Sequence, residues 1–306
     1  MKVRIIALAS TFLMLMNFAA AKELKVLMIG NSFSICVGKY LPQVVKADKK
    51  HRLILTSAYI GGCSLEKHYK QLQKAEKTPS FTPYKITVWD SENNPKNGKA
   101  VPGSVNTLLK TQQFDIITIQ QNSANSWNFK TFEPYAGELI SYIRKHQKNA
   151  EIIIHQTWAY RADSPSLKKW GFDQQGMYER LNDSYGQLAK KYQLRMIPVG
   201  KAVQIYRAET TDKYQPIDLK VKYKEPELPD FSKDPVGISL WQTTKAKGRH
   251  IHHDFSHFNK NGYYLQAVVW YGFLFGEKVG EIQFFPKEIS RKEAVFMQKC
   301  AAKALN

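Results

Sequence analysis

The sequence predicts an α/β protein, a three-layer α/β/α sandwich with a parallel sheet of about five strands between two layers of helices. Short β-branched apolar runs alternate with longer stretches whose apolar residues recur at three- and four-residue spacing, which is the pattern of strands and their covering helices. The chain has 306 residues. That length supports one large core, and no low-complexity linker divides it.

Each element is expected from its own stretch of sequence. Strands are expected over 24–29, 52–58, 115–120, 151–155 and 194–199, and helices over 34–47, 64–74, 132–145, 178–192, 259–275 and 290–305. Two stretches, 77–103 and 207–249, are rich in Pro, Lys and aromatic residues and have no clear period. Such long loops are often lids or binding loops, so we expect both to flank the substrate site. The alternative is a peripheral excursion with short strands of its own.

The first 21 residues have the layout of a secretory signal peptide. Lys2 and Arg4 precede an apolar stretch over 5–18, and three alanines end at Ala21. The stretch is too short for the roughly 20 residues of a membrane-crossing helix. We therefore expect cleavage after Ala21, a single domain over 22–306 without stable membrane insertion, and export to the periplasm or the medium. An uncleaved anchor is the alternative, and a mature chain that still begins at Met1 would favour it.

The formal net charge is +19, or about +17 without Lys2 and Arg4. Such a balance favours acidic partners. The chain has no nucleic-acid-binding motif, so we expect no nucleic-acid partner, and an anionic polysaccharide fits an exported protein better. The alternative is a basic surface that serves only solubility. Three cysteines, Cys36, Cys63 and Cys300, allow at most one bridge. We expect Cys36 and Cys63 to be free buried thiols, and a bridge between them is the alternative.

A serine follows the first expected strand, within Gly-Asn-Ser-Phe-Ser at 30–34. A serine on a tight turn from strand to helix presents its hydroxyl at the carboxyl edge of the sheet, where open α/β sheets bind ligands. Ser32 is therefore a candidate nucleophile. Asn and Ser are also ordinary helix-capping residues, so this motif alone leaves the capping role open.

A candidate base and its acidic partner lie near the other end of the chain. Asp254 and His257 share one expected loop, and a serine nucleophile needs an imidazole whose far nitrogen is held by a carboxylate. Four of the eight histidines lie within 250–257, which raises the question of a metal. No zinc-hydrolase spacing is present, so we expect neither a metal nor another cofactor. His253 is expected at the entrance of the pocket.

These motifs together resemble those of the SGNH or GDSL hydrolases, over nearly the whole expected mature chain. Gly-Asn-Ser-Phe-Ser at 30–34 resembles the first block, in the variant of a poorly characterised bacterial branch. Gly-Gly-Cys-Ser at 61–64, Gln-Gln-Asn-Ser at 120–123 and Asp-Phe-Ser-His at 254–257 resemble the later blocks. The third block departs from the family's usual Gly-x-Asn-Asp.

The resemblance implies a flavodoxin-like sheet and a set of catalytic roles. It implies Ser32 as nucleophile, His257 as base and Asp254 as the residue that orients the imidazole. The implied oxyanion hole consists of the N–H groups of Ser32 and Gly62 and the side-chain amide of Asn122. Whether Asn122 or Gln121 completes the hole stays open. Further candidates for the substrate pocket are Asn31, Gln121, Trp158 and His253, although Trp158 could equally pack into the core.

The sequence therefore predicts an exported serine esterase that acts on O-acyl esters through an acyl-enzyme. By analogy with the family, the expected substrate is an O-acetyl group on a carbohydrate. An acyl-lipid esterase or thioesterase is the enzymatic alternative. A non-catalytic glycan-binding protein on the same fold is the alternative from another class, and the intact Ser, Asp and His count against it.

Overall fold

A computed structural model describes residues 21–96 and 98–306 of the chain. The expected signal peptide lies outside the described residues, except for Ala21. None of the described helices is long and apolar enough to cross a membrane.

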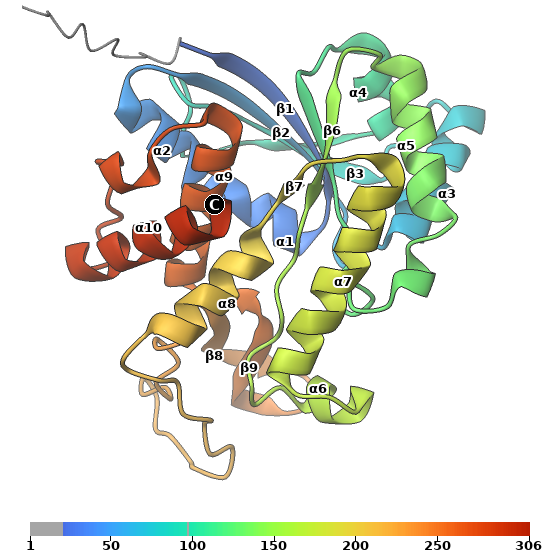
Figure 1. The fold of residues 1–306 in the computed structure, drawn as a ribbon. Coiled ribbons are helices and arrows are strands. Elements are labelled where there is room, and N and C mark those ends of the chain that lie inside the picture. Colours follow the sequence, from blue (N-terminus) through green and yellow to red (C-terminus); the bar gives the residue numbers. More distant parts are fainter. Residues whose placement is uncertain (1–20, 97) are drawn as a thin grey trace, which may run out of the picture.

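The expected parallel sheet is present, and it is larger than expected. Its strand order is β4-β3-β2-β1-β5-β6-β7 (Figure 1). The five parallel strands are the expected ones: β1 Glu23–Gly30, β2 Arg52–Tyr59, β5 Ile116–Ile119, β6 Glu151–His155 and β7 Met196–Ile197. Their order is that of flavodoxin-like sheets: the second parallel strand lies on one side of the first, and the third and later strands lie on its other side, so the strand order reverses between the first and third parallel strands. The reversal here lies between β1 and β5.

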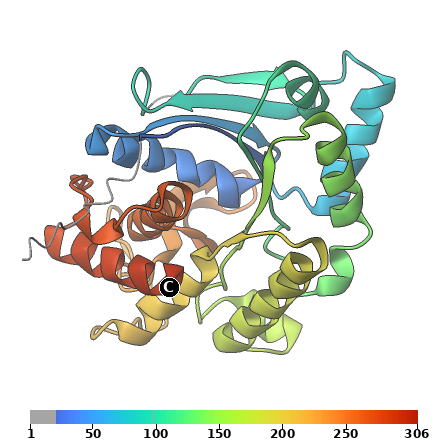
Figure 2. The ribbon, with the colours of Figure 1, turned by 45° about the horizontal axis from the view of Figure 1, so that its top comes forward.

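The expectation of about five strands missed two antiparallel strands at one edge. They are β3 Tyr84–Asp90 and β4 Ala100–Gly103. Both come from the stretch 77–103, which we expected to flank the substrate site. The structure instead places this stretch along the edge of the sheet, as Figure 2 shows, so the alternative of a peripheral excursion with its own strands is correct.

The centre of the sheet is apolar on both faces because helices cover both. In β1, the run Val26, Leu27, Met28 and Ile29 is at most 1% exposed. One helical layer contains α2 Leu41–Asp48, α8 Val199–Glu209, α9 Lys260–Phe275 and α10 Arg291–Leu305, and the other contains α3 Leu65–Lys77, α4 Val105–Thr111 and α5 Tyr135–His146 (Figure 1). Helix α9 is apolar on all sides because it packs between α2, α8 and α10.

Most expected helices are observed, with shifted ends. The stretch 34–47 is divided into α1 Ser32–Ile35, a 3-10 turn Cys36–Lys39 and α2. The stretch 178–192 forms the end of α7 Gln174–Tyr192. Three shorter helices were not expected: α4, α6 Pro165–Trp170 and α8. The three cysteines are free.

The stretch 207–249 is also not entirely loop. Its end forms a separate antiparallel hairpin of β8 Val236–Thr244 and β9 Gly248–Phe258. The hairpin lies beyond the carboxyl ends of the parallel strands, at the bottom of Figure 1. Asp254 and His257 therefore lie on a strand, not on a loop as expected.

Candidate active site

Ser32 lies at the point where β1 ends and α1 begins. Asn31 caps this helix through its side-chain oxygen, which accepts a hydrogen bond from the N–H of Phe33 at 3.0 Å. A Cβ at Gly30 would lie 2.2 Å from Oγ of Ser34, so a larger residue there would displace the Ser34 side chain. Because β1 borders the reversal of strand order, Ser32 lies where open α/β sheets bind their ligands.

Ser32, His257 and Asp254 form one hydrogen-bonded line. Nε2 of His257 lies 2.7 Å from Oγ of Ser32, and Nδ1 of His257 lies 2.6 Å from Oδ2 of Asp254. An ionised carboxylate only accepts hydrogen bonds, so Nδ1 of the imidazole donates to Asp254. In the neutral ring, Nε2 then accepts the hydrogen bond from the Ser32 hydroxyl. The hairpin thus brings together residues that are 225 positions apart in the chain.

The carboxylate of Asp254 is held in place on both oxygens. Its Oδ1 accepts hydrogen bonds from the N–H of Ser256 at 2.8 Å, the hydroxyl of Ser256 at 2.9 Å and the N–H of His257 at 3.0 Å. Burial raises the pKa of Asp254, but the hydrogen bonds from His257 and Ser256 outweigh it and hold the pKa well below its usual range. Asp254 therefore stays ionised and keeps the imidazole in one orientation.

An aromatic stack connects the nucleophile turn to the end of β9. Trp158 packs face to face between Phe33, at 4.1 Å between ring centroids, and Phe258, at 3.5 Å. Its indole N–H donates to the carbonyl of Ser256 at 2.8 Å. Trp158 has no exposed surface, so it belongs to the core and does not line the substrate pocket. It instead fixes the neighbours of both Ser32 and His257.

Gly62 and Asn122 lie beside each other in the turns that follow β2 and β5. Gly62 has a φ of 60°, a conformation that glycine adopts easily. The Asn122 amide donates to the Gly62 carbonyl at 3.1 Å, and its oxygen accepts the N–H of Asn125 at 3.0 Å. Among the described residues, no hydrogen bond occupies the N–H of Ser32 or of Gly62. These two donors and the second N–H of the Asn122 amide are free to bind an anionic oxygen.

Two other expected pocket residues point into the protein. Gln121 has no exposed surface, and its oxygen accepts the N–H groups of Leu65 and Asn122 at 3.1 and 2.9 Å. Its amide N–H donates to the carbonyl of Thr131 at 2.9 Å. Asn31 is 1% exposed, and its amide donates to the carbonyl of Cys63 at 3.0 Å. Both side chains hold loops together, so neither lines the pocket.

A buried polar chain below Ser32 was not found from the sequence. Gln120 donates to the Asn31 oxygen at 2.8 Å and lies 2.7 Å from Nδ1 of His155. Gln266 lies 3.2 Å from Nε2 of His155. Burial lowers the pKa of His155 to about 3, so its ring is neutral. In the sequence, Gln120 and His155 stand at the ends of expected strands and Gln266 stands within an expected helix. No sequence pattern shows that these side chains point inward.

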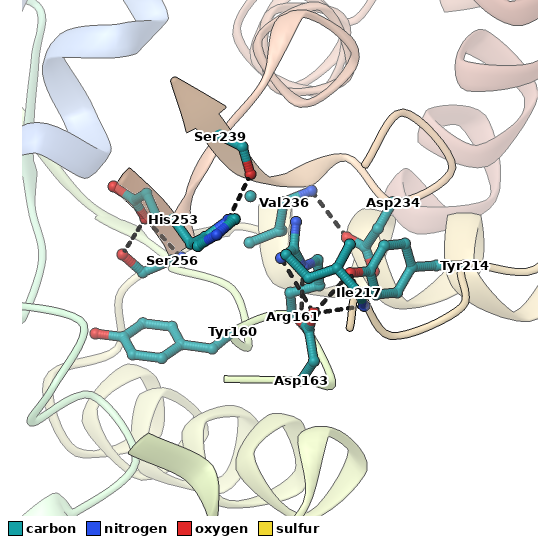
Figure 3. Close-up of polar contacts among 12 residues, drawn as sticks. Tyr160, Arg161, Asp163, Tyr214, Ile217, Asp234, Val236, Ser239, His253 and Ser256 are labelled. Atoms are coloured by element: carbon teal, nitrogen blue, oxygen red, sulfur yellow. Dashed lines mark hydrogen bonds and ion pairs between the residues drawn. The ribbon is translucent and has the colours of Figure 1, made fainter. Parts of the chain in front are cut away.

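His253 faces away from Asp254 because neighbouring residues on a strand point to opposite sides. Its Nδ1 lies 2.9 Å from the Ser239 hydroxyl, on the side of the hairpin that covers Arg161 (Figure 3). Burial and the charge of Arg161 lower the pKa of His253. His253 therefore lies on the other side of the strand from Asp254, and its expected place at the pocket entrance stays a prediction. In the described part of the chain, no group of three or more His, Cys, Asp or Glu side chains is arranged to hold a metal ion.

The sheet and the helices on its two faces form a three-layer sandwich with the strand order of flavodoxin-like proteins. The family model described as "Domain of unknown function (DUF4886)" matches residues 25–219, so the chain belongs to the DUF4886 family. This match includes Ser32, Gly62 and Asn122 and ends before the hairpin.

Solved structures include a similar protein of the same family. A DUF4886 family protein from Bacteroides uniformis is 25% identical with a TM-score of 0.72, and the alignment covers 92% of this chain and 95% of that one. A candidate SGNH hydrolase from Slackia heliotrinireducens is 17% identical with a TM-score of 0.48, covering 81% and 96%. Axe2, an acetylxylan esterase from Geobacillus stearothermophilus, is 12% identical with a TM-score of 0.36, covering 58% and 77%. No curated protein matches the chain.

Proposed function

We propose that this protein is a serine ester hydrolase. The observation that carries the proposal is the line of hydrogen bonds from the Ser32 hydroxyl through His257 to Asp254, at 2.7 and 2.6 Å. A hydroxyl that donates to a neutral imidazole, with an ionised carboxylate behind that imidazole, is set up for nucleophilic attack.

The reaction proceeds in two halves. Oγ of Ser32 attacks the ester carbonyl carbon while Nε2 of His257 takes the hydroxyl proton. The carbonyl oxygen becomes negative and accepts hydrogen bonds from the N–H groups of Ser32 and Gly62 and from the Asn122 amide. The C–O bond to the alcohol then breaks, and His257 gives the alcohol its proton. In the second half, His257 takes a proton from water as the water oxygen attacks the acyl carbon. The bond between that carbon and Oγ of Ser32 then breaks, His257 returns the proton to Oγ, and the acid leaves.

For the substrate, we propose O-acyl esters on a carbohydrate, with O-acetyl as the first acyl group to test. The choice follows the resemblance in sequence, and the net charge of +19 favours an acidic polymer. Export is part of the proposal, because an extracellular polysaccharide would not meet a protein that stays in the cytoplasm.

Hydrolysis of p-nitrophenyl acetate by the purified protein tests the proposal. Ser32→Ala and His257→Ala should each remove nearly all turnover. The double variant should be little slower than either single variant, because the two residues act as one unit. Circular dichroism of each variant serves as the control for folding. Wild-type activity in folded Ser32→Ala would contradict the assignment of the nucleophile.

A further inference from the structure

A mostly apolar pocket lies beside the Asp254 and His257 pair and has no part in the reaction described above. Its volume is about 360 Å³, within the range of small-molecule sites. Pro229, Phe231, Ile238 and Tyr263 form its apolar walls, and they come from the loop before β8, from β8 itself and from the start of α9.

The pocket shares a wall with the catalytic pair. Ile238 pairs with Asp254 across the hairpin, so the two side chains face the same side of it. Tyr263 lies on the first turn of α9, and α9 packs against the 3-10 turn Cys36–Lys39 that follows the nucleophile helix. The wall of the pocket that Tyr263 forms therefore belongs to the helix that packs beside the nucleophile turn.

The polar side chains around the pocket are largely engaged within the protein. Oδ1 of Asp230 accepts the N–H and hydroxyl of Ser232 at 2.8 and 2.7 Å. Asn259 donates to the carbonyl of Asp234 at 2.7 Å, and the ammonium of Lys260 donates to the carbonyl of Glu288 at 2.5 Å. A sugar needs polar groups that are free to bind its hydroxyls, whereas a hydrocarbon group needs only the apolar walls.

We propose that this pocket binds an apolar group of the ester substrate, several carbons long. The inference rests on the proposed esterase function and narrows its substrate: the ester carries an acyl group longer than acetyl, or an apolar group on the alcohol side. Either the acyl chain or the alcohol could supply the group, because both sides of an ester flank the carbonyl that Ser32 attacks. Each buried methylene contributes up to about 0.8 kcal/mol, roughly a fourfold change in kcat/KM.

The test compares short and long esters in two series. One series varies the acyl chain, as p-nitrophenyl acetate and hexanoate. The other series varies the alcohol, as ethyl acetate and hexyl acetate, and its hydrolysis is measured by the release of acid. We expect the longer ester to be preferred at least about tenfold in kcat/KM in one series, which identifies the side that enters the pocket.

Two variants connect the preference to the pocket. Phe231→Ala removes one wall and should reduce the ratio of kcat/KM for the long ester to kcat/KM for the short ester about tenfold. Leu240→Ala is the control, because Leu240 is 42% exposed on the same hairpin and does not line the pocket. It should alter neither rate.

Two results would overturn the proposal, and they are distinguishable. If the protein hydrolyses the short esters of both series without preferring the longer ones, or if Phe231→Ala leaves a preference unchanged, the pocket proposal is wrong and the esterase function stands. A wild-type protein that hydrolyses none of the esters removes the esterase function, and the pocket proposal with it.

Discussion

Some polar residues near the strand ends belong to the candidate active site, and others are buried and hold loops together. Their side-chain chemistry alone does not distinguish the two groups. Ser32, His257 and Asp254 are joined in one line, as their types and order in the chain predict. Asn31 and Gln121 have the same polar character as Asn122, yet both are buried. The sequence shows which side chains can donate a hydrogen bond. The direction in which each one points depends on turns that only the folded backbone defines.

Asn122 and Gln121 therefore provide a matched pair of substitutions. Asn122→Ala should lower kcat by roughly 10² to 10³-fold with little change in KM, since this donor acts mainly in the transition state. Gln121→Ala should instead lower the free energy of unfolding by about 1 to 3 kcal/mol, because it leaves buried partners without hydrogen bonds. Steady-state kinetics and urea unfolding of both variants check this. If Gln121→Ala reduced kcat as Asn122→Ala does, without loss of stability, Gln121 would be the donor.

Among the elements, the β8–β9 hairpin matters most for the site, and the sequence did not show it. Stretches rich in Lys and Pro precede β8. The sequence analysis therefore treated 207–249 as one loop without a clear period and did not predict the strand at its end. Tertiary contacts hold the hairpin in place. The N–H of Arg161 donates to the carbonyl of Phe255 at 2.9 Å, next to Asp254 in the chain. The Arg161 guanidinium lies over the ring of Tyr214, at 4.8 Å from its centroid (Figure 3). It also lies over the ring of Phe255, at 5.0 Å from the centroid.

Arg161 also forms a buried ion pair with Asp163, and its contribution to the free energy of unfolding can be measured. Nε of Arg161 donates to Oδ1 of Asp163 at 2.7 Å, and the side chain of Arg161 has no exposed surface. Asp163→Asn should lower the free energy of unfolding by about 3 to 5 kcal/mol, because it leaves a buried charge without its partner. The double variant Arg161→Met/Asp163→Asn should recover part of this loss. A double variant less stable than Asp163→Asn would show that Arg161 stabilises the hairpin without its partner.

At the scale of the whole molecule, the parallel core was predictable and its edge was not. Buried parallel strands such as β1 are continuous apolar runs, which are visible in sequence. Strand β3, the second from the edge, has exposed residues at Lys85 and Val88 and lies within a polar stretch, so its pattern is weaker. The right-handed crossover rule restricts the order of strands around β1 but does not by itself determine it. The long-range contact between Ser32 and His257 follows from no local pattern. It was expected from the residue types, their order in the chain and the resemblance to a family.

The buried histidines should make stability depend on pH. Burial lowers the pKa of His68 and His155 from 6.5 to about 3. Below pH 6.5 the unfolded chain binds protons that the folded protein does not, so the free energy of unfolding should fall as the pH falls toward 3. The slope is about 1.4 kcal/mol per pH unit for each histidine. His68→Phe should remove one such contribution between pH 6.5 and 5, measured by urea unfolding. An unchanged slope would mean that His68 is protonated in the folded protein.

The central claim is that Ser32 is an activated nucleophile, and covalent labelling tests it most directly. A fluorophosphonate reacts with a serine hydroxyl that a neighbouring base has activated, releases fluoride and leaves a stable phosphonyl ester. We predict one adduct per chain, located on Ser32 by mass spectrometry of peptides. The adduct should be lost in His257→Ala, in which the hydroxyl remains but its base is absent. An unlabelled protein, or a label on another residue, would contradict the account.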